Sequence, residues 1–520
     1  MRSVDWHRVG GHARYHATLM IASKLRIETV WLLLPLVLVF ATTAASPLKG
    51  DAWWTITTGR LIAATHTLPT SYPFTFPPQS TPFVDAQWLA QLVYVAPYPL
   101  LGLEGIVVLD AMLVTATFAL LLALAFRRSR SARAAALCTA LGGVVAGTNL
   151  QPRAQTLGYL CFAATLWLLG PPALGGRTDA PHDRWRIGAL FAIEALWANL
   201  HGSFFLGLAL TALFFLGHVG EQWRSQKLQA VLSQSRTRFL LFAGLAQALA
   251  TLITPFSLGL YAYVLQLSGN ATIRTEITEW LPPRLDTSTG VVFFVSLGLV
   301  VACLAGSRLR WRLTDVLLLT AFGVLGLQAI RNVAWWGLIL GPVLAPYAAQ
   351  VRLPLRSGDT PSKPIRVLPN AILIGALGLI ALSALPWVKD ANPLLPDERR
   401  GVITTDAPRD AARFLATRTD CGRVFSPQTW SGYLEWSFWP RCLTMVDEGP
   451  IEVYSQQVWD DYWTMHTGDQ AAVEILDKYG VDLLVLSEEQ QARLIEQVRA
   501  SPRWRQIYGD EQAGVFERTE

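Results

Sequence analysis

The sequence predicts an α-helical polytopic membrane bundle of about eleven transmembrane helices, followed by a small α/β domain outside the cytoplasm. Composition is the first observation behind this prediction. Hydrophobic residues make up 52% of the 520 residues and charged residues only 16%, and the mean hydropathy is +0.33. Soluble domains carry about a quarter charged residues, so this deficit indicates that much of the chain lies in lipid.

The second observation is that charge is segregated along the chain. Residues 401–520 contain 11 Lys and Arg against 20 Asp and Glu, whereas residues 1–400 contain 32 and 18. A net charge of −9 in one part and +14 in the other indicates two parts with different surroundings. The basic residues fall between apolar runs and form no stripe interleaved with aromatic residues, so a nucleic-acid partner is not expected.

The third observation is a series of apolar runs of the length that crosses a bilayer, about 20 residues. Eleven candidate runs are centred near residues 38, 115, 142, 162, 193, 210, 247, 297, 321, 341 and 377. A polar, basic segment precedes the first run and no small-residue cleavage site follows it. We therefore expect the first run to stay as a signal anchor.

The distribution of Lys and Arg between these runs predicts the orientation. Segments 1–27, 127–133, 171–186, 220–238, 307–313 and 351–366 hold 23 of them, whereas the intervening segments before the C-terminal domain hold six. The positive-inside rule then places the N-terminus in the cytoplasm of a cell that carries the protein in its inner or plasma membrane. An odd number of spans leads to a membrane domain of residues 1–387 and an extracytoplasmic domain of residues 388–520.

Two long loops are expected on the outer side. In the first, about residues 47–102, the stretch from Asp51 to Ala64 is predicted to be an interfacial helix with its tryptophans at the headgroup level. Asp85 is predicted to cap a second short helix. The second loop covers about residues 255–288 and ends with Glu279 and Trp280.

The C-terminal domain alternates helix and strand patterns. Helices are predicted at 406–419, 455–466, 470–479 and 488–500, and strands at 423–425, 442–446, 481–486, 503–508 and 513–517. Cys421 and Cys442 would form a disulfide outside the cytoplasm, and two free thiols are the alternative. No Cys/His spacing typical of zinc is present.

Polar residues gather where the apolar runs meet the outer loops. They are Asp51, Asp85, Gln151, Arg153, Asn199, His201, Glu279, Trp280 and Arg331. Each has an ordinary structural explanation: the acids would cap helices, the arginines would reach lipid phosphates, and the histidine would hold a turn. Their coincidence at one level of the membrane favours a functional site. A carboxylate there would take a proton or hold a divalent metal, and arginines would bind phosphate.

Several short motifs resemble the GT-C superfamily of membrane glycosyltransferases and a related, widespread bacterial family. They are Asp51-Ala-Trp-Trp with Gly59-Arg60, Trp88-Leu89, Trp197-Ala-Asn-Leu-His-Gly202, Thr254-Pro-Phe-Ser-Leu-Gly259, Trp430-Ser-Gly-Tyr-Leu434, Val446-Asp447 and Tyr479-Gly-Val-Asp482. The resemblance implies transfer of a sugar from a polyprenyl-phosphate carrier to an acceptor outside the cytoplasm, with Asp51 at the catalytic position. Many members have two adjacent acids there, whereas Ala52 follows Asp51 here. This leaves a second carboxylate to Asp85.

The leading hypothesis is therefore a glycosyltransferase with a lipid-phosphate-linked donor and an unidentified glycan, lipid or protein acceptor. Asp51 would be the base and Asp85 a second carboxylate, while the other seven residues would bind substrate. A transporter or flippase of lipid-linked saccharides is the alternative, and it predicts a polar path inward through Asp110 and Glu194. A non-catalytic assembly protein of the cell envelope is a third possibility.

Overall fold

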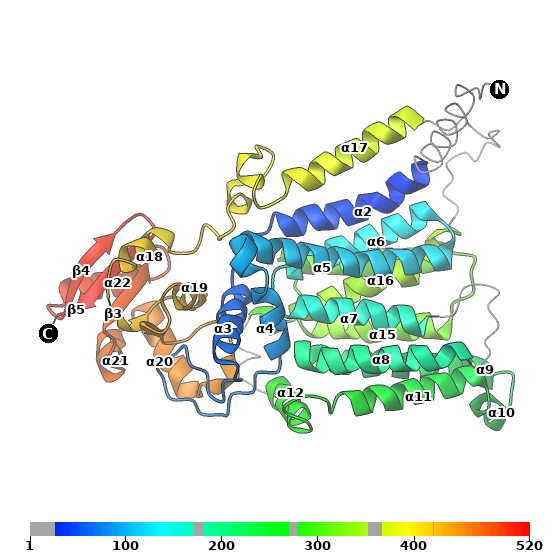
Figure 1. Ribbon diagram of the computed structural model, residues 1–520, viewed down its shortest axis with the longest axis horizontal. Helices are drawn as coiled ribbons and strands as arrows, with labels where there is room; N and C mark the ends of the chain where they lie inside the picture. Colours follow the sequence, from blue (N-terminus) through cyan, green and yellow to red (C-terminus); the bar gives the residue numbers. More distant parts are fainter. Residues whose placement is uncertain (1–25, 171–180, 270–277, 352–366, 420, 520) are drawn as a thin grey trace, which may run out of the picture.

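The computed structural model describes residues 26–170, 181–269, 278–351, 367–419 and 421–519. Parts of the predicted segments 1–27, 171–186, 255–288 and 351–366 lie outside these residues. A bundle of long helices occupies one end of the molecule and a small sheet domain the other (Figure 1). Helices α3 and α4 lie between them, across the end of the bundle (Figure 1).

A helix is present at each of the eleven predicted positions. These helices are α2 (Ile27–Ala44), α5 (Tyr98–Ser129), α6 (Ala132–Ala146), α7 (Gln155–Leu169), α8 (Pro181–Leu200), α9 (Phe205–Trp223), α11 (Ser235–Ala250), α14 (Ser288–Gly306), α15 (Leu313–Gln328), α16 (Val333–Ala348) and α17 (Val367–Ser383). Within the described residues, four helical stretches are long and apolar enough to cross a membrane: Ile27–Ala44, Tyr98–Ser129, Gly202–Trp223 and Ser288–Gly306. The structure thus gives four clear spans, and the count of eleven stays a prediction.

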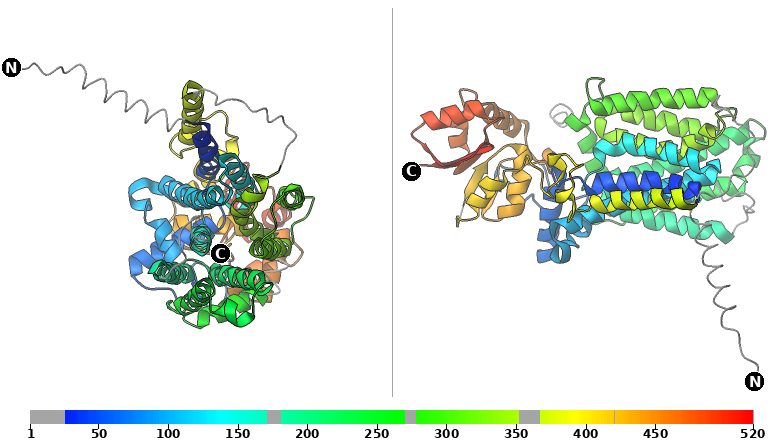
Figure 2. Two further views of the ribbon diagram at one scale, coloured as in Figure 1. Left: turned by 90° about the vertical axis from the view of Figure 1, so that its right-hand side faces the viewer. Right: turned by 90° about the horizontal axis from the view of Figure 1, so that it is seen from above.

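Helix α16 is the centre of the bundle. Nearly every residue along it is buried, and it packs most closely against α6. Glycines permit this approach, because a Cβ on Gly142 would lie 2.4 Å from the carbonyl oxygen of Gly337. Small residues at such contacts are the usual means by which apolar helices associate in lipid, where water gives no driving force between them. The left view of Figure 2 shows the bundle from its end, with the long helices seen side by side.

Shorter elements close the end of the bundle that faces the C-terminal domain. They are α3 (Asp51–Thr65), α4 (Trp88–Val95), α12 (Gly259–Gly269) and the 3-10 turns η1 (Gly147–Asn149), η2 (Gly202–Phe204), η3 (Thr278–Trp280) and η4 (Ile330–Asn332). Helix α10 (Leu228–Leu232) belongs to the opposite end, as Figure 1 shows. These turns follow or precede long helices, so they bring distant segments to one level.

Helix α3 is present where a helix was predicted, but its tryptophans do not lie at the lipid headgroups as expected. Trp53 is 1% exposed, and its ring packs 5.0 Å from that of Tyr433, while Trp54 is 7% exposed and packs against Tyr72. Both indoles therefore contact protein instead of lipid headgroups. The helix after Asp85 begins at Trp88 with Gln87 at the N-cap position, so the prediction that Asp85 caps it is wrong.

The C-terminal domain is a five-stranded mixed sheet with helices packed on it. The strands are β1 (Gly422–Phe425), β2 (Cys442–Thr444), β3 (Leu483–Ser487), β4 (Trp504–Gly509) and β5 (Ala513–Arg518), in the order β2-β1-β3-β5-β4. Strands β2, β1 and β3 are parallel, and β5 is antiparallel to β3 and β4. The helices are α18 (Arg409–Leu415), α19 (Gln428–Phe438), α20 (Gln456–Thr467), α21 (Ala472–Lys478) and α22 (Ala492–Ala500), with turns η5 (Lys389–Ala391), η6 (Asp397–Arg399) and η7 (Ile451–Val453). Helix α19 was not predicted.

The first loop joins the edge of this sheet. Thr75 pairs with Thr444 of β2 in a parallel bridge, with the Phe76 amide donating to the Thr444 carbonyl at 3.0 Å. A second parallel bridge joins Leu48 to Ile403. The hydrophobic core that contains Trp53 also contains residues of α19 and β3, so the loop and the domain share one core.

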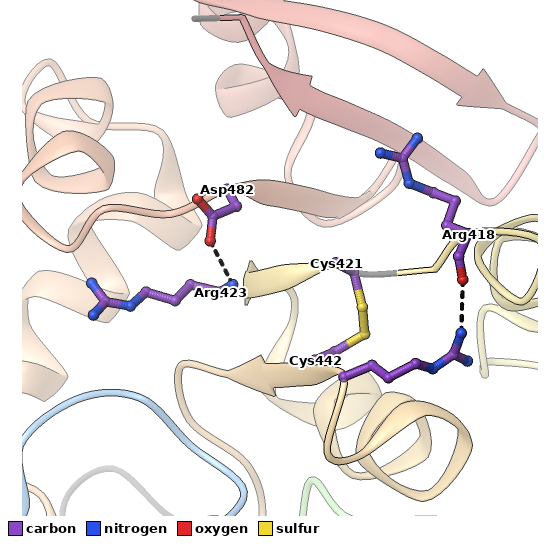
Figure 3. Close-up of a disulfide and its surroundings, with 6 residues drawn as sticks. Arg418, Cys421, Arg423, Cys442 and Asp482 are labelled. Atoms are coloured by element: carbon purple, nitrogen blue, oxygen red, sulfur yellow. Dashed lines mark hydrogen bonds between the residues drawn. A yellow bond between two sulfur atoms is a disulfide. The ribbon is translucent and has the colours of Figure 1, made fainter.

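A disulfide joins Cys421 and Cys442, with their Cα atoms 5.2 Å apart (Figure 3). It links the start of β1 to the start of β2, next to the rung at which Gly422 pairs with Cys442. Beside it, the Arg423 amide donates to Asp482 at 2.8 Å (Figure 3). The structure thus decides between the two alternatives that the sequence left open for these cysteines.

Candidate functional site

Asp51 is the first residue of α3, at the end of the bundle that faces the C-terminal domain. Its side chain is 40% exposed, so solvent reaches the carboxylate. Its pKa is nevertheless raised, chiefly because the surrounding protein displaces water; Glu279 adds to this rise, and Arg153 opposes it. A recessed but accessible carboxylate with a raised pKa is suited to take a proton from a substrate hydroxyl.

Arg153 connects Asp51 to the second loop. The guanidinium is 3% exposed, and its Nη1 donates to both carboxylate oxygens of Glu279 at 3.1 Å and lies 3.6 Å from Asp51 Oδ2. Its Nη2 donates to Asn149 at 2.8 Å. Burial acts to raise the pKa of Glu279, but the charges of Arg153 and then Arg331 outweigh burial, so the pKa lies below its usual value. Arg153 is therefore an ion-paired residue that holds two acids in place.

Arg331 lies on η4 and stacks on Trp280 of η3, with its guanidinium 4.7 Å from the ring centroid. The two turns are joined by the Ile330 amide, which donates to the Leu281 carbonyl at 2.9 Å. Within the part of the chain that the structure describes, no hydrogen bond or ion pair engages the Arg331 guanidinium. Burial and the nearby charge of Arg153 lower its pKa, and Glu279 opposes this. Among the described residues, this cation therefore has no bonded anion.

His201 precedes η2 and acts as its N-cap. Its Nδ1 accepts from the Ser203 amide at 3.1 Å, which leaves the ring proton on Nε2. Burial lowers its pKa to about 3, and the charges of Arg331 and Arg153 contribute. The imidazole is therefore neutral and lies near both arginines. Nδ1 thus holds the turn, as the structural explanation expected, whereas Nε2 keeps a proton that it can donate to a ligand.

Asn199 is used by the scaffold. Its Nδ2 donates to the carbonyls of Ala195 at 2.8 Å and Ile253 at 2.7 Å, and its Oδ1 accepts from Trp88 at 3.0 Å. These bonds fasten the end of α8 to the start of α4. Gln151 is half-buried, and its backbone carbonyl accepts from Thr156.

Asp85 is buried, with 2% of its surface exposed. Its Oδ1 accepts from Gln91 at 2.8 Å, and its Oδ2 has no partner among the described residues. Burial raises its pKa to about 7. No hydrogen bond or ion pair between Asp85 and Asp51 occurs in the described ranges, so Asp85 as the second carboxylate stays a prediction.

Glu448, which the sequence analysis missed, lies beside Asp51. A Cβ on Gly50 would lie 3.3 Å from Glu448 Oε2, so the carboxyl group rests against the residue that precedes Asp51. Burial, followed by the charge of Asp51, raises the pKa of Glu448 to about 8. No local pattern signals this residue, because the approach joins positions that are almost 400 residues apart in sequence.

The neighbouring Asp447 explains how Glu448 is held. The Tyr72 hydroxyl donates to the Asp447 carboxylate, and the Gly449 amide donates to it at 3.2 Å. Its carbonyl accepts from Gln428 at 2.8 Å. Asp447 thus fixes the turn after β2 between the first loop and α19.

Among the described residues, the acids around Asp51 do not form a cluster of the kind that holds a divalent metal. Glu279 uses both oxygens on Arg153, and Asp447 is bonded to Tyr72. Among the described residues, no group of three or more His, Cys, Asp or Glu side chains is arranged to hold a metal ion. The donor set does not fit the divalent metal considered from the sequence, and no step below uses one.

Among the described residues, no chain of hydrogen bonds or ion pairs joins Asp110 to Glu194 along the inward path that a transporter would need. Tyr94 donates to Asp110, and Gln247 donates to Glu194 at 3.0 Å. No hydrogen bond or ion pair links these two networks within the residues described. Each acid is instead paired inside its own group of helices, and neither pairing favours transport.

Comparison with known proteins shows which solved structures have a similar fold. No protein-family model matches the sequence, and no curated protein matches it. Among solved structures, ArnT from Cupriavidus metallidurans bound to undecaprenyl phosphate aligns with a TM-score of 0.50 at 15% identity, over 94% of this chain and 97% of its own. The arabinofuranosyltransferase AftD from Mycobacteria gives 0.55 at 17% identity, over 95% of this chain and 40% of its own.

A third similar structure is the oligosaccharyltransferase AglB from Archaeoglobus fulgidus, in complex with an inhibitory peptide and a dolichol-phosphate. It gives a TM-score of 0.51 at 12% identity, over 88% of this chain and 69% of its own. The chain has the GT-C fold. At such identities the likeness shows the GT-C fold alone, and activity has to be argued from the site.

Proposed function

We propose that the protein is a membrane glycosyltransferase that moves a sugar from a polyprenyl-phosphate carrier to an acceptor outside the cytoplasm. One observation carries the proposal. An accessible carboxylate, Asp51, lies in the same site as a guanidinium, Arg331, that lacks an anionic partner among the described residues. The fold adds support, because ArnT and AglB are described with undecaprenyl phosphate and dolichol-phosphate respectively.

The transfer assigns a task to each group. Asp51 takes the proton of the acceptor hydroxyl while the hydroxyl oxygen forms a bond to the anomeric carbon of the sugar. The bond from that carbon to the phosphate oxygen breaks, and polyprenyl phosphate leaves with the electron pair. Arg331 holds the phosphate charge, because guanidinium and phosphate make short, charge-assisted hydrogen bonds. The Nε2 proton of His201 is a second donor, and the free face of Trp280 would contact the sugar.

Arg153 has a positioning task in this scheme. Glu279 already uses its Nη1, so a phosphate would have to compete with a bidentate carboxylate. The pair instead anchors the second loop next to Asp51. We therefore assign phosphate binding to Arg331 first, which narrows the earlier hypothesis that both arginines share it.

The proposal includes a membrane topology. Residues 1–387 form the membrane domain with a cytoplasmic N-terminus, and residues 388–520 form the domain outside. The surplus of Lys and Arg in alternate segments supports this, and so does the disulfide, because disulfides persist mainly in oxidising compartments.

The test uses purified full-length protein in proteoliposomes with a panel of polyprenyl-phosphate sugars and a cell-envelope fraction as acceptor. Release of polyprenyl phosphate is followed by mass spectrometry. We expect Asp51→Asn to lower turnover by about 10²- to 10⁴-fold, the usual contribution of a general base, while lipid-phosphate binding stays. Arg331→Ala should weaken binding of undecaprenyl phosphate.

Matched controls come from the second loop. Asp286 and Arg284 form an exposed ion pair at 2.7 Å, so Asp286→Asn and Arg284→Ala change the same charges away from the site. If Asp51→Asn transferred sugar as fast as Asp286→Asn, the proposal would be contradicted. Undecaprenyl-phosphate binding by Arg331→Ala at the level of Arg284→Ala would contradict the assignment of the phosphate.

A further inference from the structure

The turn after β2 reaches into the site from the C-terminal domain. It contacts the first loop twice and α12 once: Asp447 is bonded to Tyr72, the Ser80 amide donates to the Val453 carbonyl at 2.7 Å, and the Tyr263 hydroxyl of α12 donates to Glu452 at 2.8 Å. The segment from Asp447 to Val453 is thus held from several sides. Glu448, within it, has a defined position.

The backbone beside Asp51 is shaped to admit Glu448. Gly50 has a φ of +55°, and a side chain there would meet Glu448 Oε2 at 3.3 Å and Oε1 at 3.7 Å. The positive φ favours glycine, and a Cβ at this position would press lightly on the Glu448 carboxyl group. Among the described residues, no hydrogen bond or ion pair engages the Glu448 carboxyl group. Its neighbours Asp447, Glu452 and Glu279 have partners, so among these four described acids Glu448 is the one that keeps its hydrogen-bonding capacity for a ligand.

We propose that Glu448 contacts the hydroxyl-bearing acceptor next to Asp51, so that the C-terminal domain supplies an acceptor-binding side chain to the transfer site. The inference rests on the proposed function and deepens it by assigning the acceptor side. Arg331 and Trp280 form the donor side, on η4 and η3. Glu448 lies against Gly50, on the side from which the C-terminal domain approaches α3. An acceptor that bonds to Glu448 would present a hydroxyl to the Asp51 carboxylate.

The groups that face Glu448 determine the form in which it acts. Burial is the largest cause that raises its pKa, followed by the charges of Asp51 on α3, Asp447 on its own turn and Glu279 on η3, while the charge of Lys49 lowers it. Tyr462 on α20 lies near enough to feel its charge. With a pKa of about 8, the group is protonated at neutral pH and donates a hydrogen bond. Above that pH it ionises beside Asp51, and acceptor binding weakens.

The experiment titrates the cell-envelope acceptor in proteoliposomes that hold full-length protein and a labelled polyprenyl-phosphate sugar. We expect Glu448→Ala to raise the acceptor concentration for half-maximal rate by about tenfold, with half-saturation by the donor unchanged. Glu448→Gln keeps a neutral donor, so it should stay near wild type at pH 7. It should also lose the decline in rate that wild type shows above pH 8.

Controls separate this inference from folding and from the proposed function. Glu489→Ala removes an exposed acid of the same domain, and thermal midpoints show whether each variant folds. Suppose that Glu448→Ala needs the same acceptor concentration for half-maximal rate as Glu489→Ala, while Asp51→Asn is inactive. That result would overturn the inference and leave the proposed function intact. Equal losses in Glu448→Gln and Glu448→Ala would overturn the neutral donor. Wild-type protein without transfer would instead overturn the proposed function.

Discussion

Replacing Gly59 by alanine should displace the helix that carries Asp51. The added Cβ would lie 2.2 Å from the carbonyl oxygen of Gln91 and 2.7 Å from its carbonyl carbon. These atoms are backbone, and the first distance is more than 1 Å short of the 3.4 Å at which ordinary contacts begin. Helices α3 and α4 must therefore separate. Overpacking of this kind costs about 1–3 kcal/mol, and a backbone obstacle favours the upper end.

The assay compares thermal midpoints of Gly59→Ala and Gly188→Ala, followed by tryptophan fluorescence in detergent. Gly188 lies in α8 with no atom within 4 Å of its Cβ position, so alanine there should be neutral or slightly stabilising through its helix propensity. We expect Gly59→Ala to unfold several degrees lower and to lose turnover, because Asp51 begins the displaced helix. A midpoint equal to that of Gly188→Ala would refute the close approach of α3 and α4.

Two further predictions concern the C-terminal domain. In intact cells, Cys421 and Cys442 should resist alkylation until they are reduced. Replacing both by serine should lower the free energy of unfolding by about 3 kcal/mol, the value expected for a loop of this length. Ready alkylation without reductant would place the domain in the cytoplasm. Glu435 is buried beside Asp447, and burial followed by that neighbouring charge raises its pKa well above the ordinary value. The folded state therefore binds more protons than the unfolded state above the ordinary glutamate pKa, and stability falls as pH rises through the folded pKa. Glu435→Gln should raise the thermal midpoint at pH 8 by a few degrees and flatten this decline, and a midpoint that falls at pH 8 would contradict a protonated Glu435.

The sequence predicted the helices of the bundle well because apolar runs are a local property. A helix was expected and found around residues 115, 210 and 297, where the apolar run is long enough to stand out from its neighbours. Strand β3 was also predicted, since its continuous apolar run reflects burial on both faces. Helix α19 was missed. Its sequence contains aromatic residues and Gly432, and a glycine is unfavourable inside a helix. The glycine makes room for Trp53 of α3, because a Cβ on Gly432 would lie 3.1 Å from the Trp53 Cβ, and this contact is not visible in the local sequence.

The contents of the site were predicted less completely, and the reason is again distance in sequence. The prediction brought Asp51, Arg153, Glu279 and Arg331 to one level, and the structure places them within one network of charges. Glu448 was not predicted, because membrane topology says which end of a bundle a loop occupies but not which turn of a separate domain reaches it.

The packing of α3 gives the C-terminal domain a direct part in the position of Asp51. Arg60 of α3 donates to the Trp436 carbonyl at 3.0 Å and stacks on the Trp436 ring at 4.3 Å, while Trp53 lies in the core shared with α19. One face of the helix is thus packed on the C-terminal domain and another on α4. Since buried contacts of this kind permit little independent movement, the base and the proposed acceptor contact would move together with the domain. A rigid connection of this sort explains why the motifs Asp51-Ala-Trp-Trp and Trp430-Ser-Gly-Tyr-Leu434, far apart in sequence, pack against each other.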